Sequence, residues 1–281
     1  MKVHFTKMHG IGNDFVVIDC VNQAVSLTDE QARWIADRHY GVGCDQILLV
    51  EPPRSSDVAF RYRILNADGS EVNQCGNGAR CFARFVVEHN LCEATEFPVE
   101  TAAGVMILSI QEDGRVRVNM GAPELTPEKI PFVPPQPGSS DGQSRYRLDV
   151  EGETLDLSVV SMGNPHAVLR VEDIEAAPVT ALGPKIENHA AFPARANVGF
   201  MQVVDRDHIR LRVWERGAGE TLACGSGACG AVVAGHLLGE LDDNVTVDLP
   251  GGRLAVDWPG GDAPVYLTGP AETVFEGTLE I

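Results

Sequence analysis

The chain carries an internal repeat, which constrains its fold more than any other feature of the sequence. In the first half AFRYRILN leads to NADGSEVNQCGNG, and in the second half IRLRVWE leads to ERGAGETLACGSG. Asn66 and Glu215 precede Cys75 and Cys224, and both pairs are offset by 149 positions (215 − 66 and 224 − 75). Self-similarity of this kind indicates a repeated structural unit. We therefore expect a duplicated α/β (α+β) unit folded as two pseudo-symmetric halves.

Two shorter fragments extend the repeat. GND around Asn13 matches GNP around Asn164 with an offset of 151, and Asp45 ahead of ILLV matches Asn197 ahead of GFMQ with an offset of 152. All the matches occur in one order with similar offsets, so chance is a poor explanation. We expect an N-terminal half over residues 1–122 and a C-terminal half over residues 123–268.

Local patterns indicate which elements each half contains. The segment after Cys75 has apolar residues at i, i+3, i+4 and i+7, and the segment ACGAVVAGHLLG after Cys224 is apolar nearly all round, as expected for an enclosed helix. The proline-rich and glycine-rich stretch at 133–144 has the composition of an exposed loop or linker. Alternating or continuous apolar runs predict strands at Phe15–Asp19, Gln46–Val50, Ala59–Leu65 and Met106–Ile110.

The charge balance bears on partners and compartment. With 22 basic against 40 acidic residues, the net charge is −18, and the sequence has no Lys/Arg cluster. Nucleic acid and anionic membranes are therefore not expected as partners, because phosphate binding needs a clustered basic surface. The stretch MKVHFTKMHG has no apolar signal region, and no segment approaches the length of a membrane span. We expect a cytoplasmic protein that acts on a small molecule.

The chain has seven cysteines, an odd number in a sequence of 281 residues. Disulfide frameworks belong mainly to short secreted chains, so most of these cysteines should be reduced thiols. Unpaired cysteine commonly serves as a small buried hydrophobe, which is the reading that suits Cys20, Cys44 and Cys92.

The stretch NQCGNGARC places Cys75 at the front of a glycine-rich turn and a second thiol six residues later. A metal site is disfavoured, because structural zinc wants close pairs with clear spacing and the second thiols, Cys81 and Cys229, are not equivalent in the repeat. A phosphate loop is disfavoured as well, because CGNG and CGSG lack the Lys-Ser/Thr and the three-glycine spacing of known loops. A disulfide would be a damaged or regulatory state in a reducing compartment.

The remaining hypothesis is catalysis, which gives a role to the matching cysteine of each repeat. A thiol at a helix N-terminus has its thiolate favoured by the helix dipole, and glycines there free backbone N–H groups to hold a carboxylate. A single such cysteine would suggest a nucleophile with a histidine base. Two related thiols, Cys75 and Cys224, can instead approach one carbon from opposite faces, one removing a proton and the other delivering one. That is a two-base racemisation or epimerisation.

The sequence also resembles a known family. The segments MHGIGNDFVVID, GVGCDQILLVE, RILNADGSEVNQCGNGARCFARF, SMGNPHAV, ANVGFMQV and WERGAGETLACGSGACGA are similar to the signatures of the diaminopimelate epimerases, in order and over nearly the whole chain. The resemblance implies interconversion of LL- and meso-2,6-diaminopimelate in lysine and peptidoglycan precursor biosynthesis, with no cofactor and no metal. It further implies a curled sheet or barrel around a central helix in each domain, an active site in the cleft between the domains, and a C-terminal strand (269–281) that returns to the first domain.

The resemblance assigns roles to individual residues. Cys75 and Cys224 would be the catalytic pair, with Cys75 taking the proton from the LL isomer and Cys224 from the meso isomer. His166 and Glu215 would tune proton transfer or hold an ammonium group, and Arg216 would hold the distal carboxylate. The remaining substrate-binding positions that the resemblance implies are Asn13, Gln46, Asn66, Gly76, Asn77, Asn164, Asn197, Gly225 and Ser226.

Plainer readings exist for several of these residues. Alone, His166 would be a structural or exposed histidine, Asn13 a turn residue and Glu215–Arg216 a surface pair; only their context favours function. A related isomerase, similar to proline racemase or to phenazine-biosynthesis isomerases, is the nearest alternative, and a cysteine-liganded metal or redox-sensing protein is a more distant one. Phe275 falls where some members of the family carry tyrosine near dimer contacts, so we expect a homodimer.

Overall fold

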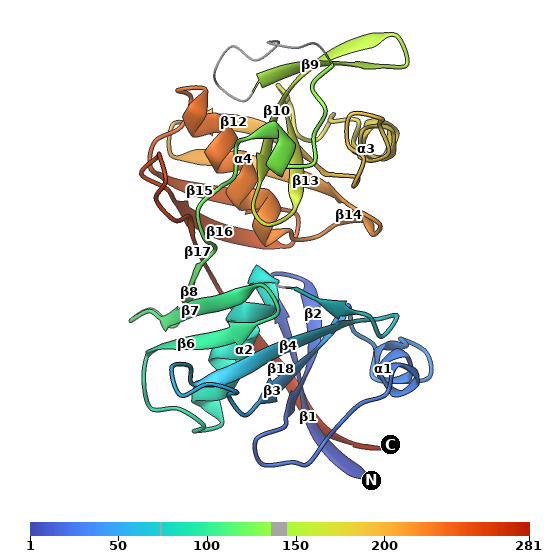
Figure 1. Cartoon of the computed structure of the whole chain (residues 1–281), viewed down its shortest axis with the longest axis vertical. Helices are drawn as coiled ribbons and strands as arrows, with labels where there is room; N and C mark the ends of the chain where they lie inside the picture. Colours follow the sequence, from blue (N-terminus) through green and yellow to red (C-terminus); the bar gives the residue numbers. More distant parts are fainter. Residues whose placement is uncertain (74, 136–144) are drawn as a thin grey trace. The chain divides into compact units, whose positions relative to one another are not determined.

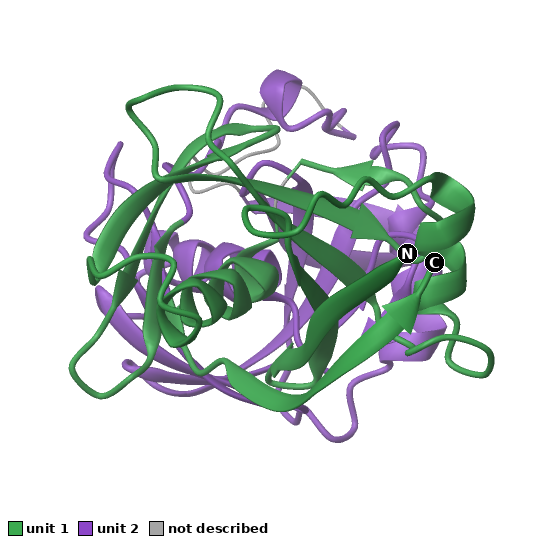
Figure 2. Cartoon of the chain, turned by 90° about the horizontal axis from the view of Figure 1, so that it is seen from below, with its two compact units in different colours: residues 1–119, 268–281 green, residues 120–267 purple. Residues whose placement is uncertain are grey.

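The computed structural model describes residues 1–73, 75–135 and 145–281. The chain divides into two compact units, one formed by Met1–Asn119 with Thr268–Ile281 and the other by Met120–Leu267 (Figure 2). Most of the loop expected at 133–144 lies outside the described residues. Among the described residues, no helix combines the length and the apolar character that a membrane span requires.

The first unit wraps its strands around one helix, α2 (Gly76–Glu88), as Figure 1 shows. This helix contacts six of the unit's strands, namely β1, β2, β3, β4, β7 and β8. A second helix, α1 (Asp29–Ala36), packs on the opposite face, where its Ile35 belongs to one buried cluster with Ile18 and Ile47. The strands of this unit are β1 (Lys2–Gly10), β2 (Asn13–Asp19), β3 (Gln46–Glu51), β4 (Phe60–Asn66), β5 (Glu71–Val72), β6 (Glu96–Thr101), β7 (Gly104–Ile110), β8 (Val116–Asn119) and β18 (Glu272–Glu280).

The second unit has the same plan around α4 (Gly225–Leu237), which contacts β10, β11, β12, β13 and β16. Helix α3 (Val179–Glu187) lies outside, against β12, β13 and β14, and a short helix η1 (Pro127–Lys129) precedes the strands. Its strands are β9 (Arg145–Val150), β10 (Glu153–Ser161), β11 (Pro165–Arg170), β12 (Asn197–Asp205), β13 (His208–Glu215), β14 (Gly219–Thr221), β15 (Asn244–Leu249) and β16 (Gly252–Asp257), and β17 (Tyr266–Gly269) runs across the unit boundary.

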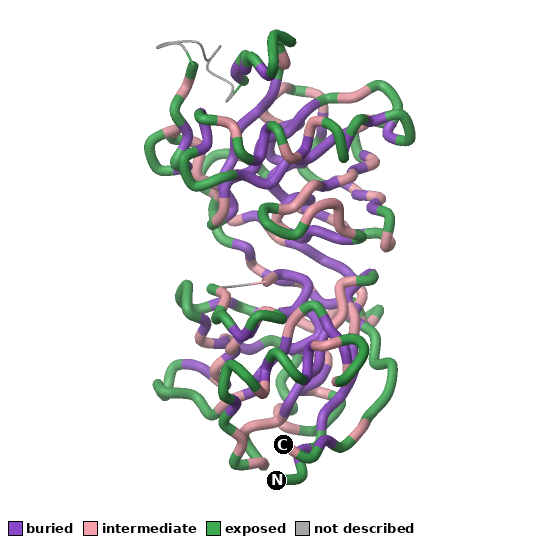
Figure 3. The backbone as a smooth tube through the Cα atoms, turned by 90° about the vertical axis from the view of Figure 1, so that its right-hand side faces the viewer, coloured by how far each residue is buried: buried purple, intermediate pink, exposed green. Residues whose placement is uncertain are grey.

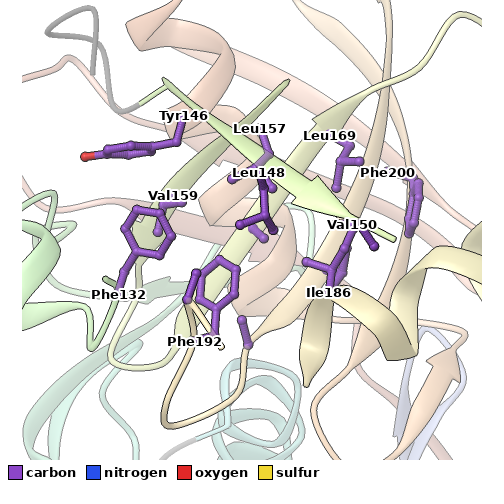
Figure 4. Packing of buried hydrophobic residues seen from close by; sticks show 14 of the residues in the cluster. Phe132, Tyr146, Leu148, Val150, Leu157, Val159, Leu169, Ile186, Phe192 and Phe200 are labelled. Atoms are coloured by element: carbon purple, nitrogen blue, oxygen red, sulfur yellow. The ribbon is translucent and has the colours of Figure 1, made fainter. Parts of the chain in front are cut away.

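The outer face of the second sheet has its own apolar core, shown in Figure 4. Phe132 lies 4.7 Å from Tyr146 and 5.0 Å from Phe192, measured between ring centroids. Leu148 and Phe200 are fully buried in the same cluster. Burial of this kind stabilises by about 25 cal/mol per Å² of apolar surface. In Figure 3 the buried stretches follow the strands and central helices of each unit, and the exposed stretches follow the connecting loops.

Strand pairing repeats between the units. In the first, β2 and β3 are parallel, β3 and β4 antiparallel, and β4 and β6 parallel. In the second, β11 and β12, β12 and β13, and β13 and β15 repeat these three relations. The structure therefore has the expected mixed α/β fold with a central helix in each half.

The register corrects one detail of the repeat alignment. Phe15 pairs with Gln46 at the start of β3, and His166 pairs with Asn197 at the start of β12. Gln46 is therefore the counterpart of Asn197, with an offset of 151 (197 − 46). The alignment of Asp45 with Asn197 was wrong by one residue, because it matched a polar residue before an apolar run without regard to which face of the strand it occupies.

The expected strands are confirmed within a few residues at their ends. Both helices expected after the thiols are also confirmed, and each begins at the residue that follows its cysteine. The four residues that set the apolar period of α2, namely Ala79, Phe82, Ala83 and Val86, are 0 % exposed. In α4, ten residues between Gly225 and Gly235 are buried, as expected for a helix whose sequence is apolar on all sides.

Candidate active site

Cys75 is the N-cap residue of α2, and its Sγ accepts a hydrogen bond from the Gly78 amide at 3.4 Å. The thiol is half-buried. Gly76 and Asn77, both buried, are the first two residues of the helix, so their N–H groups belong to the set that has no partner within the helix. The positive end of the helix dipole therefore lies at this thiol.

Asn13 joins the thiol to a polar network. Its Oδ1 accepts from Asn77 Nδ2 at 3.2 Å and lies 3.9 Å from Cys75 Sγ. Its Nδ2 donates to Asp45 Oδ2 at 2.8 Å, and Arg38 donates to Asp45 Oδ1 at 2.9 Å. The amide of Asn13 is thus fixed at both ends, with its oxygen toward the thiol.

Asp14 supports the same hydrogen-bond network. Burial by itself raises the pKa of this carboxyl, but hydrogen bonds from Arg38 and Lys7 outweigh burial and hold its pKa well below the ordinary range. Arg38 binds Asp14 through both guanidinium nitrogens, at 3.0 and 2.7 Å, and Lys7 Nζ donates at 2.6 Å. The bidentate arginine makes this a rigid support.

Gln46 and Asn66 lie side by side at the ends of β3 and β4. They are directly paired in the sheet, and Gln46 Nε2 donates to Asn66 Oδ1 at 3.0 Å. Gln46 Oε1 is buried, and among the described residues it has no hydrogen-bond partner. A buried acceptor of this kind costs free energy unless something donates to it.

In the second unit Cys224 is the N-cap residue of α4 and only 3 % exposed. Burial and the negative charge of Glu215 raise its pKa well above the ordinary value, and contacts with the Gly227 amide and the Ser226 hydroxyl oppose this only in part. The helix dipole that should favour a thiolate is therefore outweighed here. Cys224 is a protonated thiol at neutral pH.

A chain of three polar side chains leads away from Cys224. Ser226 Oγ lies 3.7 Å from its sulfur and accepts from Asn164 Nδ2 at 3.3 Å. Asn164 Oδ1 in turn lies 3.0 Å from His166 Nε2. Burial, with a smaller contribution from the Arg216 charge, lowers the pKa of His166 to about 3. His166 is therefore a neutral imidazole that can accept or donate a hydrogen bond.

The turn after β13 holds Arg216. Its backbone N–H donates to Asn197 Oδ1 at 3.0 Å, and its guanidinium donates to the Ala194 carbonyl at 3.0 Å. Glu215 accepts from the Thr221 hydroxyl at 2.5 Å. The Arg216 side chain is exposed and can present its remaining N–H groups to a carboxylate.

The structure thus brings the candidate residues together in two groups, one in each unit. The first holds Cys75, Gly76, Asn77, Asn13, Gln46 and Asn66, and the second holds Cys224, Gly225, Ser226, Asn164, His166, Asn197, Glu215 and Arg216. Among the described residues, no three His, Cys, Asp or Glu side chains are grouped as a metal site would require. Burial raises the pKa of Cys20, Cys44 and Cys81 to about 12, which suits packing groups rather than acid–base groups.

Sequence reasoning missed the residues that support these two groups. Asp14, Asp45 and Arg38 orient Asn13, and buried Glu187 accepts from the Trp214 indole and the Gly217 amide beside Arg216. Asp45 was noted only as a point of alignment. The available signal was a charged residue, Asp45, next to an apolar strand, but the residues that it bonds to lie far away in the sequence.

Comparison with known proteins identifies the family of the chain. A family model described as diaminopimelate epimerase matches residues 5–126 and 158–274. Proteins named diaminopimelate epimerase from Thioalkalivibrio sulfidiphilus and Stutzerimonas stutzeri are 58 % and 57 % identical to the chain, and each alignment covers 100 % of both sequences.

Solved structures share the fold at low sequence identity. A phenazine biosynthesis protein of the PhzF family from Bacillus anthracis superposes with a TM-score of 0.71 at 17 % identity, covering 100 % of both chains. A probable proline racemase from Agrobacterium radiobacter gives a TM-score of 0.71 at 16 % identity, covering 99 % of this chain and 92 % of that one. The family model and the full-length relatives lead to one conclusion: the chain belongs to the diaminopimelate epimerase family and is an isomerase.

Proposed function

We propose that the protein interconverts LL- and meso-2,6-diaminopimelate by a two-base mechanism in which Cys75 and Cys224 are the acid–base groups, in the biosynthesis of lysine and peptidoglycan precursors. The observation that carries the proposal is the repeated geometry of the thiols. Each is the N-cap residue of a buried, glycine-initiated helix at the centre of its unit. Two such thiols are what proton removal on one face of a carbon and delivery on the other require.

The proton balance is simple. From the LL isomer, the Cys75 thiolate removes the α-proton and becomes a thiol, while the Cys224 thiol donates its proton to the opposite face and becomes a thiolate. The reverse direction exchanges the two roles. The raised pKa of Cys224 supports its part as the initial donor, because burial and Glu215 keep this sulfur protonated.

The helix N-termini would bind the carboxylate on the reacting carbon. Negative charge builds up there as the proton leaves, and the N–H groups of Gly76, Asn77, Gly225 and Ser226 would stabilise it as an oxyanion hole does. Stabilisation of this kind acts on the transition state more strongly than on the substrate and so raises kcat.

The polar side chains would select a substrate with two amino-acid groups. The buried Gln46 Oε1 is an acceptor available to an ammonium group, and neutral His166 is a second. Arg216 would bind the distal carboxylate in a bidentate manner. Asn13, Asn66, Asn164 and Asn197 would complete the binding set, and Glu215 would tune Cys224.

The decisive test is proton exchange in the two cysteine variants. Wild-type protein with the LL substrate in deuterated water should add deuterium at one α-carbon without pyridoxal phosphate and in the presence of a chelator. Cys75→Ala and Cys224→Ala should each lower turnover by a factor of about 10²–10⁴ or more. Cys81→Ala and Cys229→Ala are matched controls, because these thiols lie six and five residues further along the same helices. Full activity in either N-cap variant would reject the two-thiol mechanism.

The fold is shared with proline racemase and PhzF proteins, so a related isomerase activity is the second candidate. Proline offered to the wild-type protein should not be racemised, because it has no second head group for Arg216. A homodimer is part of the proposal and can be checked by light scattering in solution.

A further inference from the structure

Thr221 on β14 donates a hydrogen bond from its hydroxyl to Glu215 Oε1 at 2.5 Å. In the β13–β14 hairpin, Val213 lies directly opposite Thr221, and Glu215 follows Val213 by two residues. Directly opposed residues, and residues two apart on one strand, share a face of the sheet. The side chains of Thr221 and Glu215 are therefore diagonal neighbours on one face, and the strand register brings the hydroxyl to the carboxylate.

This face of the hairpin lies against the start of α4. A Cβ added to Gly227 would lie 3.1 Å from Val213 Cγ2 and 3.1 Å from the Cys224 sulfur, so both side chains border the same glycine. Burial, the charge of Glu215 and a side-chain hydrogen bond with Glu215 all raise the pKa of Cys224. Thr221, Glu215 and Cys224 therefore form a continuous row of contacts.

The opposite face of the hairpin has a fastening of its own. Arg212 donates to the two carboxylate oxygens of Glu220 at 2.7 and 3.1 Å, and Glu220 lies opposite Trp214 in the sheet. The backbone pairing of β13 and β14 therefore has support that is independent of the Thr221 hydroxyl. Removal of that hydroxyl should release the Glu215 side chain without unfolding the hairpin.

The first unit differs at the corresponding place. Val72 lies opposite Ile64 just as Thr221 lies opposite Val213, and both pairs are offset by 149 positions (213 − 64 and 221 − 72). Valine has no hydroxyl to donate. The residue two positions after Ile64 is Asn66, whose amide donates to the Ser70 hydroxyl at 3.1 Å instead. The hydroxyl on β14 thus accompanies the carboxylate of the second unit, whereas the first unit has an amide and an apolar neighbour.

We propose that Thr221 is a positioning residue for Glu215, and that its hydroxyl fixes the carboxylate in the orientation that faces the Cys224 sulfur. The inference deepens the proposed function and rests on it for its meaning in catalysis. The approach of Glu215 to Cys224 can nevertheless be measured without substrate.

The physical reason is the freedom of a glutamate side chain. A half-exposed glutamate has several rotamers, and holding one of them costs conformational entropy unless a bond selects it. A hydrogen bond to an ionised carboxylate is among the stronger ones in proteins. Without the hydroxyl, the Glu215 carboxylate should spend more time away from the sulfur.

Four variants test this role. Thr221→Val removes the hydroxyl and keeps the shape of the side chain, whereas Thr221→Ser keeps the hydroxyl. Thr246→Val is the matched control, because it makes the same change at a half-buried position of β15 in the same unit. Glu215→Ala, alone and combined with Thr221→Val, shows whether Thr221 acts through the carboxylate. The measurements are kcat/KM with the LL substrate and the rate of Cys224 alkylation by iodoacetamide at neutral pH, followed by peptide mapping.

Thr221→Val should lower kcat/KM about tenfold, the loss expected for one positioning hydrogen bond. It should also speed Cys224 alkylation about threefold or more, because the thiolate is the reactive form and a nearby negative charge disfavours it. Thr221→Ser should stay within about twofold of wild type, since the bond is kept. Thr246→Val should match wild type.

The combined variant distinguishes positioning from a loosened structure. Adding Thr221→Val to Glu215→Ala should leave the alkylation rate unchanged, because the hydroxyl then has no carboxylate to hold. An equal acceleration in that background, or an unchanged rate in Thr221→Val itself, would overturn the proposal. Thr221→Ala is measured in parallel, so that the same comparison is available if the valine variant does not fold.

The results also separate this inference from the proposed function. If Thr221→Val speeds alkylation only when Glu215 is present but Cys224→Ala keeps full epimerase activity, the proposed function fails and the positioning role stands. If Cys224→Ala is inactive but Thr221→Val equals wild type in both measurements, the positioning role fails and the proposed function stands.

Discussion

Asn13 and Asn77 are joined side chain to side chain across 3.2 Å, although 64 positions separate them in the chain. Asn77 belongs to the first turn of α2, and Asn13 opens β2 on the sheet that surrounds the helix. Asn13 is held from its other end by Asp45 at 2.8 Å. A continuous polar chain therefore runs from the sheet surface to the thiol of Cys75.

Asp45→Ala should misorient Asn13. The substitution removes the acceptor of the Asn13 amide, which frees the side chain to rotate away from Cys75. We expect kcat/KM to fall about tenfold, the loss that corresponds to one positioning hydrogen bond of about 1–1.5 kcal/mol. Steady-state kinetics with the LL substrate measures this, and Asp113→Ala, which removes an exposed ion pair with Arg115, is the control. Equal kinetics in the two variants would contradict the positioning role.

Glu187→Ala should loosen the turn that carries Arg216. The buried carboxylate accepts from Trp214 Nε1 at 2.8 Å, from the Gly217 amide at 2.8 Å and from Arg195 at 3.2 Å. Its loss leaves two donors unsatisfied and should cost about 2–4 kcal/mol in the free energy of unfolding, with a raised KM. Glu187→Gln keeps an acceptor oxygen and should show a smaller loss. Denaturant unfolding measures the free energy of unfolding of both variants. Similar losses in the two would contradict the role of Glu187 as a hydrogen-bond acceptor.

Glu215→Gln should lower the pKa of Cys224 toward its ordinary value. Burial is the larger cause of the raised pKa and remains in the variant, so the shift should be partial. The thiolate absorbance assigned to Cys224, by difference from Cys224→Ser, should therefore appear at a lower pH in Glu215→Gln than in wild type. An unchanged titration would show that Glu215 does not act on this sulfur.

His166 should stay neutral across the working range. Its pKa of about 3 means that its ring signals in a nitrogen-detected NMR experiment should not titrate between about pH 5 and pH 8. Because the folded value lies below the unfolded one of about 6.5, the unfolded state binds more protons as pH falls and stability declines. His166→Gln should make that decline shallower between these two values. A ring midpoint near 6 would refute the expectation.

Gly78→Ala should disturb the capped turn. A Cβ there would overlap the Tyr62 hydroxyl and press on Leu48 and Phe15. Overpacking of this kind costs about 1–3 kcal/mol, and it should also weaken the bond between the Gly78 amide and the Cys75 sulfur. Thermal unfolding should show a lowered Tm, and steady-state kinetics should show a reduced kcat. Gly199→Ala is the control, since the nearest atom to its added Cβ lies 3.5 Å away.

Much of the fold was readable from the sequence because the repeat and the apolar periods are both local signals. The helices after Cys75 and Cys224, and the strand predicted at Ala59–Leu65, were expected from short segments. The outer helices α1 and α3 were not identified. Each is only 8 or 9 residues long, and α3 contains a proline, which weakens the helical pattern.

The candidate site residues were predicted from sequence motifs, but the residues that hold them in place were not. Arg38, Lys7 and Glu187 act through bonds to residues 7 to 30 positions away, which no periodic pattern records. The raised pKa of Cys224 also lay beyond the sequence, because the helix dipole is visible in the motif whereas burial and the approach of Glu215 are properties of the folded chain. The one-residue error at Asp45 has the same origin, since only strand pairing fixes the register.

The last strand has a consequence for the order in which the chain can fold during synthesis. β18 follows the whole of the second unit in the sequence, yet it pairs along its length with β1 in the first. Residues 120–267 are contiguous, so the second unit can close as soon as they leave the ribosome. The first unit must wait, with the free edge of β1 exposed, until the final strand arrives, and in those seconds the nascent chain presents an unpaired sheet edge for chaperones to protect.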